Sequence, residues 1–454
     1  MAIQSINPAT GKTEKTFNEH SSNQVMIMIE DVNCAFREWR KTDFAFRAGL
    51  MKKAAQILRE QKEHYGKILT LEMGKPITQA IAEVEKCALV CEYYADNAEK
   101  ILKEEIVQTD ASESYVRFDP LGIILAIMPW NFPFWQVFRV AAPALIAGNV
   151  CLLKHASNVP MSALSIEEIF TNAGFPKNSF KTLLVGSSIV KEIIDNPHVK
   201  AVTLTGSEPA GKQVASMSGS KLKKTVLELG GSDPFIVLED ANIDEAVRTA
   251  VTARIINNGQ SCIAAKRFIV VKEIYAEFEK KFVDAMKKVK IGDPMKKETE
   301  LGPIAREDLL NELDAQVKQS VEKGAVVLCG GKRINHEGFF YEPTILGNLT
   351  KGMPAYEDEI FGPVASLIKA KDEKDAIRIA NDSQFGLGAS LWTSNISKAK
   401  IIAGKIESGS VFINGMVKSD PRLPFGGIKN SGYGRELSHY GIKEFVNIKT
   451  VWIK

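Results

Sequence analysis

One cysteine stands in a polar, glycine-containing loop, Asn257-Asn-Gly-Gln-Ser-Cys262, directly after a predicted helix. This position favours solvent access over packing. Because the thiolate is the nucleophile, nearby positive charge or N–H groups are expected to lower the pKa of the Cys262 thiol. The alternative is a small buried cysteine. A cysteine protease would also need a paired histidine, and none of the six histidines lies in a motif that indicates one.

Two other segments carry groups that complement a thiol nucleophile. Glu228, in Val-Leu-Glu-Leu-Gly-Gly, is a carboxylate among apolar neighbours at a strand end, where a raised pKa suits a general base. The alternative is an ion-paired glutamate at the sheet edge. Asn131, in Met-Pro-Trp-Asn-Phe-Pro-Phe, has an amide that can donate to an oxyanion. The alternative for Asn131 is a turn residue or helix cap.

A third segment resembles a phosphate-binding loop. Gly206-Ser-Glu-Pro-Ala-Gly-Lys212 follows a predicted strand, but position 213 is Gln where Ser or Thr would hold magnesium. Pro209 also removes one backbone N–H from the cradle. A nucleoside triphosphatase is therefore disfavoured. A helix N-terminus with the Ser207 hydroxyl can still hold a pyrophosphate, as a variant dinucleotide site without GxGxxG.

The elements that must position these groups alternate between strand and helix from about residue 120. This rhythm predicts parallel, doubly wound α/β sheets that bind ligands at the carboxyl ends of their strands. The first hundred residues are read as helices, a hairpin is predicted around residue 110, and residues 445–453 are expected to add a strand to it. The first run has strands at 122–128, 149–154, 182–185, 201–205 and 225–229, and helices at 137–146, 161–172, 189–195 and 211–218. A second run begins after Pro234.

Composition excludes several classes of function. The 454 residues carry a formal net charge of +3, too even a balance to indicate nucleic acid or an anionic membrane. No apolar run is long enough to span a bilayer, and no secretory signal is visible. The six cysteines form no CxxC pair, which favours reduced thiols in a cytoplasm, and no metal motif is present.

Seven motifs in order resemble the NAD(P)-dependent aldehyde dehydrogenases, and the resemblance covers nearly the whole chain. They are Pro129-Trp-Asn-Phe-Pro, Leu153-Lys, Leu204-Thr-Gly-Ser, Leu227-Glu-Leu-Gly-Gly, Gly259-Gln-Ser-Cys, Glu359-Ile-Phe-Gly-Pro and Pro424-Phe-Gly-Gly. The resemblance implies a Rossmann-like cofactor domain (1–103 and 121–230), an α/β catalytic domain (231–435) and a small β oligomerisation arm (104–120 and 436–454). It also implies a homodimer or homotetramer.

The resemblance assigns roles by residue. Cys262 would attack the aldehyde carbon, Asn131 with the backbone N–H of Cys262 would stabilise the oxyanion, and Glu228 would activate the water that hydrolyses the thioester. The cofactor, NADP or NAD, would be bound by seven residues: Trp130, Lys154, Ser157, Ser207, Gly230, Glu359 and Phe361.

One departure from the family pattern bears on the cofactor. The family commonly reads Lys-Pro-Ala/Ser-Glu where this chain has Lys154-His-Ala-Ser157. In NAD-preferring members that glutamate binds the adenosine ribose and repels a 2′-phosphate. Ser157 removes the charge and Lys154 supplies a cation, so NADP acceptance is expected. The consequence of His155 in place of proline stays open.

The substrate depends on three further residues. Gln136 and Arg139 are three apart on the helix after Asn131, and Ser419 precedes a motif that borders the family's aldehyde tunnel. A guanidinium there would bind a substrate carboxylate, which looks like the succinate-semialdehyde dehydrogenases. The alternative for Arg139 is an ion pair, and the chain would then oxidise neutral aldehydes. A catalytically silent binding protein of the same fold is a distant alternative.

Overall fold

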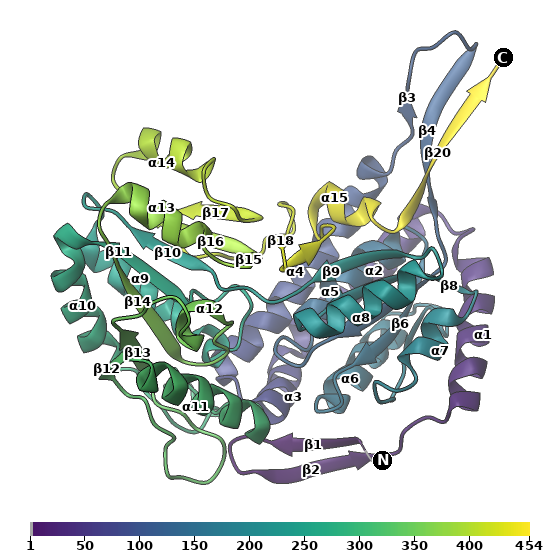
Figure 1. Ribbon diagram of the computed structural model, residues 1–454. Helices are drawn as coiled ribbons and strands as arrows, with labels where there is room; N and C mark the ends of the chain where they lie inside the picture. Colours follow the sequence, from purple (N-terminus) through teal and green to yellow (C-terminus); the bar gives the residue numbers. More distant parts are fainter. Residues whose placement is uncertain (1–2) are drawn as a thin grey trace.

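The computed structural model describes residues 3–454, and two parallel-stranded sheets dominate it (Figure 1). The first sheet has six strands in the order β19-β9-β8-β5-β6-β7, all parallel except β19. The chain leaves β5 toward β6 and β7 and then returns to β8 and β9, so the strand order reverses between β5 and β8. The bounds are β5 (Ile123–Met128), β6 (Val150–His155), β7 (Phe180–Thr182), β8 (Val199–Thr205), β9 (Lys224–Glu228) and β19 (Gly432–Tyr433).

Helices cover both faces of this sheet, because its strands are apolar on both sides and must be buried on both. One continuous core joins them. The strand predicted at 182–185 lies instead at Phe180–Thr182, so only Thr182 is common to both. The helices are α1 (Ser22–Trp39), α2 (Phe44–Glu60), α3 (Lys62–Met73), α4 (Ile77–Ile101), α5 (Trp135–Ile146), α6 (Pro160–Asn172), α7 (Val190–Asp195) and α8 (Glu208–Gly219).

The second sheet has seven strands in the order β12-β13-β14-β11-β10-β16-β17, with only β12 antiparallel to its neighbour. Its strands are β10 (Pro234–Val237), β11 (Arg267–Val271), β12 (Val326–Cys329), β13 (Thr344–Gly347), β14 (Val364–Ala370), β16 (Gly388–Trp392) and β17 (Ser410–Ile413). Its helices are α9 (Ile243–Ile255), η1 (Ile256–Gly259), α10 (Lys272–Met286), α11 (Glu307–Glu322), α12 (Pro354–Glu357), α13 (Glu373–Asn381) and α14 (Ile396–Ala403). A two-stranded sheet, β15 (Phe385–Gly386) with β18 (Ile428–Lys429), adjoins it.

A three-stranded antiparallel arm projects from the body, at the upper right of Figure 1. The hairpin predicted around residue 110 is β3 (Glu105–Ile106) with β4 (Glu113–Pro120), and β20 (Val446–Ile453) pairs with β4 over its full length. The C-terminal strand predicted for 445–453 is therefore confirmed. The short α15 (Ser438–Lys443) precedes it.

The N-terminal region differs from the prediction of helices alone. Residues 3–17 form a hairpin of β1 (Ile3–Asn7) and β2 (Lys12–Phe17) before the first helix begins. β2 is polar and almost wholly exposed, so it lacks the apolar alternation by which a half-buried strand is recognised. No helix among residues 3–454 is long and apolar enough to cross a membrane.

Candidate functional site

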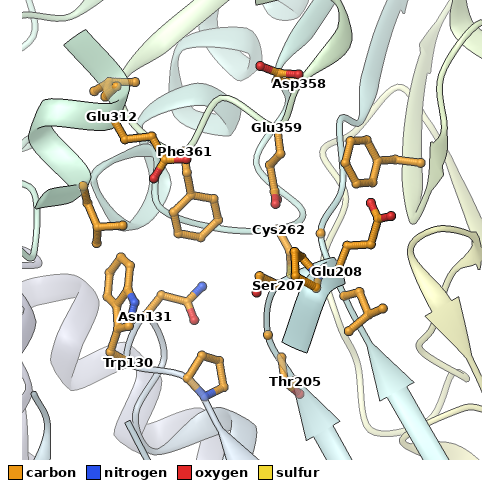
Figure 2. A pocket seen from close by; sticks show the side chains of 18 of the residues that line it. Trp130, Asn131, Thr205, Ser207, Glu208, Cys262, Glu312, Asp358, Glu359 and Phe361 are labelled. Carbon is orange, nitrogen blue, oxygen red and sulfur yellow. The ribbon is translucent and has the colours of Figure 1, made fainter. Parts of the chain in front are cut away.

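A cavity of about 480 Å³ opens at the carboxyl edge of the first sheet, where the strand order reverses between β5 and β8, and faces loops of the second sheet (Figure 2). A reversal of strand order is where open α/β sheets bind ligands. Eight of the thirteen residues that the sequence singled out line this cavity: Trp130, Asn131, Gln136, Ser207, Gly230, Cys262, Glu359 and Phe361.

The Cys262 loop has an unusual backbone. Asn257, Asn258 and Gly259 all have left-handed conformations, with φ of 56°, 58° and 74°. Side-chain amides support this loop, because the Asn258 Nδ2 donates to the carbonyls of Gly74 (2.8 Å) and Pro303 (2.9 Å). Left-handed residues cost free energy and persist only where surrounding contacts over-determine them. The loop is therefore held in one shape, with the cysteine at its end.

The electrostatics of Cys262 differ from the expectation of a lowered pKa. Burial raises the pKa of the Cys262 thiol to about 12, while the charges of Lys266 and Arg139 act in the opposite direction. Lys266 Nζ donates to the carbonyls of Ser261 (2.8 Å) and Cys262 (2.7 Å), so its ammonium lies under the loop. The resting thiol is thus protonated, and thiolate formation must be coupled to a proton acceptor.

Asn131 is fixed on both of its polar ends. Its Nδ2 donates to the carbonyl of Gln260 at 3.1 Å, and its Oδ1 accepts from the Gln136 Nε2 at 3.0 Å. Its backbone carbonyl accepts from the Asn257 Nδ2 at 2.7 Å. Because an amide nitrogen carries two N–H groups, one donor remains for a ligand. Asn131 is therefore tied to the Cys262 loop with its amide in a defined orientation.

A buried ion pair beneath Asn131 was not anticipated from the sequence. The ammonium of Lys75 contacts a carboxylate oxygen of Glu83 and also donates to the Asn131 carbonyl at 3.0 Å. The other oxygen of Glu83 accepts the backbone N–H groups of Phe134 (2.9 Å) and Trp135 (3.0 Å). We call Lys75 and Glu83 the positioning pair, because together they hold both ends of the Asn131 turn.

Glu228 lies in a second buried cluster, which we call the proton cluster: Glu228, Arg139 and Glu436. Burial, and next the charge of Glu436, raise the pKa of Glu228 well above its usual value; Arg139 and Arg435 oppose this. Neither carboxylate oxygen of Glu228 has a hydrogen-bond partner among residues 3–454. Arg139 ion-pairs with Glu436 and donates to the Thr205 hydroxyl at 3.2 Å. Glu228 is thus an uncommitted carboxyl group beside a charge pair.

The groups expected to hold a dinucleotide surround the open part of the cavity. Ser207 precedes α8 and makes no capping hydrogen bond from its side chain within the described chain, so the free N–H groups there suit a pyrophosphate. Glu359 accepts the Gly231 N–H at 3.0 Å and presents its carboxylate to the cavity, where ribose hydroxyls can donate to it. A Cβ on Gly230 would collide with that carboxylate.

Two aromatic rings close one side of this space. Trp130 and Phe361 meet edge to face, with ring centroids 5.8 Å apart, and Figure 2 shows them across the cavity from Ser207. An apolar wall opposite a helix N-terminus, with a carboxylate between them, fits a nicotinamide dinucleotide. No cluster of His, Cys, Asp and Glu in residues 3–454 fits a metal ion.

Lys154 and Ser157 lie beyond the cavity lining, at the carboxyl end of β6 beside β5. Burial lowers the pKa of Lys154, while Ser157 is exposed. His155 is buried between them: its Nε2 contacts the Pro133 carbonyl at 2.8 Å, and burial lowers its pKa to about 4. The neutral imidazole therefore ties the end of β6 to the Asn131 turn.

The three predicted substrate residues occupy different surroundings. Gln136 lines the cavity. Arg139 does not, and its pairing with Glu436 corresponds to the ion pair that was the alternative for this residue. Ser419 is buried and accepts from the Trp135 Nε1 at 3.1 Å and from the Lys86 Nζ at 2.7 Å. The structure thus gives Arg139 and Ser419 different partners, Glu436 for the first and Lys86 and Trp135 for the second.

Comparisons with known proteins agree with this site. Residues 1–451 match the model of the aldehyde dehydrogenase family. The chain is 54% identical over 453 residues to a probable succinate-semialdehyde dehydrogenase (NADP⁺) from Synechocystis sp., and 51% identical over 456 residues to succinate-semialdehyde dehydrogenase (NADP⁺) 1 from Mycobacterium tuberculosis, with 100% of each chain covered. The succinic semialdehyde dehydrogenase of Streptococcus pyogenes, solved with NADP⁺, superposes with a TM-score of 0.98 at 42% identity over both whole chains.

Proposed function

Because this chain belongs to the aldehyde dehydrogenase family, we propose that it oxidises succinic semialdehyde to succinate with NADP⁺, and also accepts NAD⁺. One observation carries the proposal. A half-buried thiol, an amide tied to the same loop and a row of cofactor-binding groups share one cavity at the reversal point of the first sheet. The names of the 51–54% identical relatives support the substrate and the phosphorylated cofactor.

Carbon–sulfur bond formation is the first step. The Cys262 thiol releases its proton to water in the cavity, and its sulfur attacks the aldehyde carbon. The carbonyl oxygen becomes an oxyanion that the free amide N–H of Asn131 and the backbone N–H of Cys262 stabilise. The positioning pair supports Asn131 for this role through its backbone carbonyl. When bound, the oxidised nicotinamide supplies the acceptor for the hydride that leaves the thiohemiacetal carbon.

Hydrolysis of the resulting thioester needs a base, which we assign to Glu228. Water adds to the thioester carbon, Glu228 takes its proton, and the thiol of Cys262 leaves as succinate forms. A carboxyl group whose pKa is raised by burial is a stronger base than an exposed one. Its uncommitted oxygens support this assignment, because no hydrogen bond has to be broken before it takes a proton.

The cofactor assignment rests on the groups around the cavity. Ser207 would hold the pyrophosphate, Glu359 a ribose, and Trp130, Gly230 and Phe361 the surroundings of the nicotinamide half. Lys154 and Ser157 would receive the adenosine 2′-phosphate. Lys154 is a partly buried cation whose pKa is lowered by burial, which supports a nearby anion in the bound state.

The projecting arm supports a homodimer or homotetramer. Several apolar side chains on the arm are exposed, because no residue of the described chain covers them: Ile106, Val107, Ile448, Trp452 and Ile453. Contiguous exposed apolar surface marks interaction sites.

A second candidate function, oxidation of neutral aldehydes, is favoured by one observation. The guanidinium of Arg139 is already paired with Glu436 and lies over the Phe425 ring, 4.7 Å from its centroid. A paired guanidinium is a poor anchor for a substrate carboxylate. If no other cation served the substrate, a neutral aldehyde would be turned over as well as an acidic one.

The test of the proposed function is reduction of NADP⁺ and of NAD⁺ by succinic semialdehyde, with succinate measured as product. Cys262→Ser should abolish turnover, and Cys34→Ser, at an exposed cysteine, should match the wild type. Turnover with NADP⁺ at least equal to that with NAD⁺ is expected. Activity retained in Cys262→Ser would overturn the proposed mechanism.

A further inference from the structure

One buried imidazole contacts the Asn131 turn (residues 129–134) from the first sheet. His155 is the last residue of β6 and is buried. Its Nε2 lies 2.8 Å from the Pro133 carbonyl oxygen. Because a carbonyl can only accept, Nε2 carries the proton and donates to it. The other ring nitrogen, Nδ1, accepts from the Ala156 N–H at 2.9 Å, which agrees with this tautomer.

The buried Pro133 carbonyl depends on this side chain for its hydrogen bond. The carbonyls of its neighbours Phe132 and Phe134 accept the backbone N–H groups four positions later, at 3.2 and 2.9 Å, as the chain enters α5. The Pro133 carbonyl accepts no backbone N–H within residues 3–454. A buried carbonyl without a donor costs free energy. His155 therefore supplies the bond that the start of α5 omits.

The same turn carries the amide that the proposed mechanism uses for the oxyanion. The turn lies between β5 and α5, so neither a strand nor a helix fixes its shape. Lys75, between α3 and α4, donates to the Asn131 carbonyl at 3.0 Å, and His155 binds the Pro133 carbonyl two residues later. Two separate elements of the fold thus each hold one carbonyl of the turn.

The sheet keeps the imidazole in one place. His155 pairs with Met128, the last residue of β5, and the Ala156 N–H also donates to the Met128 carbonyl at 2.9 Å. The residue therefore lies beside the point where the chain leaves β5 and begins the turn. Burial lowers the pKa of His155 to about 4, so the ring keeps one donor and one acceptor at neutral pH.

We propose that His155 is a positioning residue for the oxyanion site: its Nε2–H, anchored on β6, holds the Pro133 carbonyl and thereby the orientation of the Asn131 amide. This inference rests on the proposed function and deepens it. Rates of enzymes depend steeply on such placement, because small displacements of a donor weaken its bond to the transition state. His155 contacts neither substrate nor cofactor in this role and acts through Asn131.

The test uses the rate of the first turnover, measured as NADPH formation at saturating NADP⁺ and succinic semialdehyde. His155→Met has an unbranched side chain without a donor and should lower this rate about tenfold, the equivalent of one lost hydrogen bond. His155→Gln places an amide N–H near the position of Nε2 and should stay within about threefold of the wild type. His155→Asn ends one bond earlier and should behave like His155→Met.

A double-mutant cycle separates positioning from a general structural role. In an Asn131→Ala background, His155→Met should change the residual first-turnover rate less than twofold, because the group it positions is already absent. A tenfold loss in both backgrounds would overturn the proposal. His20→Met removes another histidine that binds a backbone group, the Leu184 N–H, outside the cavity lining, and should match the wild type within about twofold.

Cofactor affinity and folding provide the remaining checks. The Kd for NADP⁺, from quenching of protein fluorescence, should stay within about twofold in His155→Met, because pairing of β5 with β6 still holds Lys154. Weaker NADP⁺ binding with an unchanged first-turnover rate would overturn the proposal. If His155→Met does not fold, the comparison of His155→Gln with His155→Asn decides, and equal rates in these two variants would overturn it.

The outcomes distinguish this inference from the proposed function. A wild-type enzyme that oxidises succinic semialdehyde, combined with a His155→Met variant of equal rate, would overturn the role of His155 alone. A wild-type enzyme that reduces neither NADP⁺ nor NAD⁺ with succinic semialdehyde would contradict the proposed function itself.

Discussion

Two buried charge clusters serve the same stretch of chain, residues 129–139, and differ in how completely their charges are paired. In the positioning pair, one oxygen of Glu83 meets Lys75 and the other accepts two backbone N–H groups. In the proton cluster, Arg139 pairs with Glu436, and Glu228 has no hydrogen-bond partner among the described residues. A fully paired cluster holds geometry, whereas an uncommitted carboxyl group is free to exchange a proton.

Of the changes to either cluster, removal of the proposed base Glu228 should reduce turnover most. Glu228→Gln keeps the shape of the side chain and abolishes its basicity. Steady-state turnover should fall about 10³-fold, within the range for general bases, while the first turnover still produces NADPH. Rapid mixing with absorbance detection of NADPH measures the burst. A slow first turnover without a burst would place Glu228 before hydride transfer and contradict its role in hydrolysis.

Breaking the positioning pair should cost stability first. Lys75→Met leaves the Glu83 carboxylate buried without its cation, which destabilises a fold by about 3 kcal/mol. Urea unfolding checks this value. The double variant Lys75→Met/Glu83→Gln should recover part of the loss because the uncompensated charge is gone. If single and double variants unfold at the same urea concentration, the pair does not behave as a coupled unit.

Removal of Arg139 should act alike on an acidic aldehyde, succinic semialdehyde, and on a neutral one, butanal. Without its guanidinium, two carboxyl groups face each other, and the pKa of Glu228 should rise further. At neutral pH the rate should fall about tenfold, as for a shift of about one pKa unit, and should recover at higher pH. Turnover of succinic semialdehyde and of butanal by Arg139→Met provides the check. A loss confined to the acidic aldehyde would restore Arg139 as the direct carboxylate anchor.

The smallest expected effect is a displacement of the pH profile. In the proposed mechanism hydrolysis needs deprotonated Glu228, so kcat should rise as pH increases through the raised pKa of this group. Glu436 raises that pKa, so Glu436→Gln should move the acidic limb of the kcat profile to lower pH by less than about one unit. Displacement toward higher pH, or none, would show that Glu436 does not act on Glu228 through its charge.

Local patterns in the sequence predicted the features that depend on local chemistry. The strand–helix rhythm placed β5, β8 and β9, and parallel strands bring their carboxyl ends together, so Asn131, Ser207 and Gly230 were expected near one edge. Cys262 stood out through its polar loop. These residues do line one cavity, although their chemical roles stay predictions.

The features that escaped prediction depend on contacts between distant parts of the chain. Arg139 turns toward Glu436, nearly 300 positions later, and Lys86 meets Ser419, 333 positions away. No periodicity within α4 or α5 specifies which of several polar residues finds a partner. The composition of the Cys262 loop led to the expectation of a lowered pKa. Burial of the thiol raises the pKa instead, and this burial follows from how the loop packs, which its composition does not reveal. The local sequence around Lys86 showed only that it lies three positions after Glu83 on the same helix, α4.

Trapping of the covalent intermediate tests most directly whether Cys262 forms the thioester and Glu228 is needed only for its hydrolysis. Glu228→Gln is mixed with NADP⁺ and succinic semialdehyde, quenched in acid after one turnover, and its peptides are mapped by mass spectrometry. We predict one succinyl group on the peptide that contains Cys262, in an amount equal to the NADPH formed. NADPH formation without an adduct at Cys262, or with the adduct on another residue, would contradict the account.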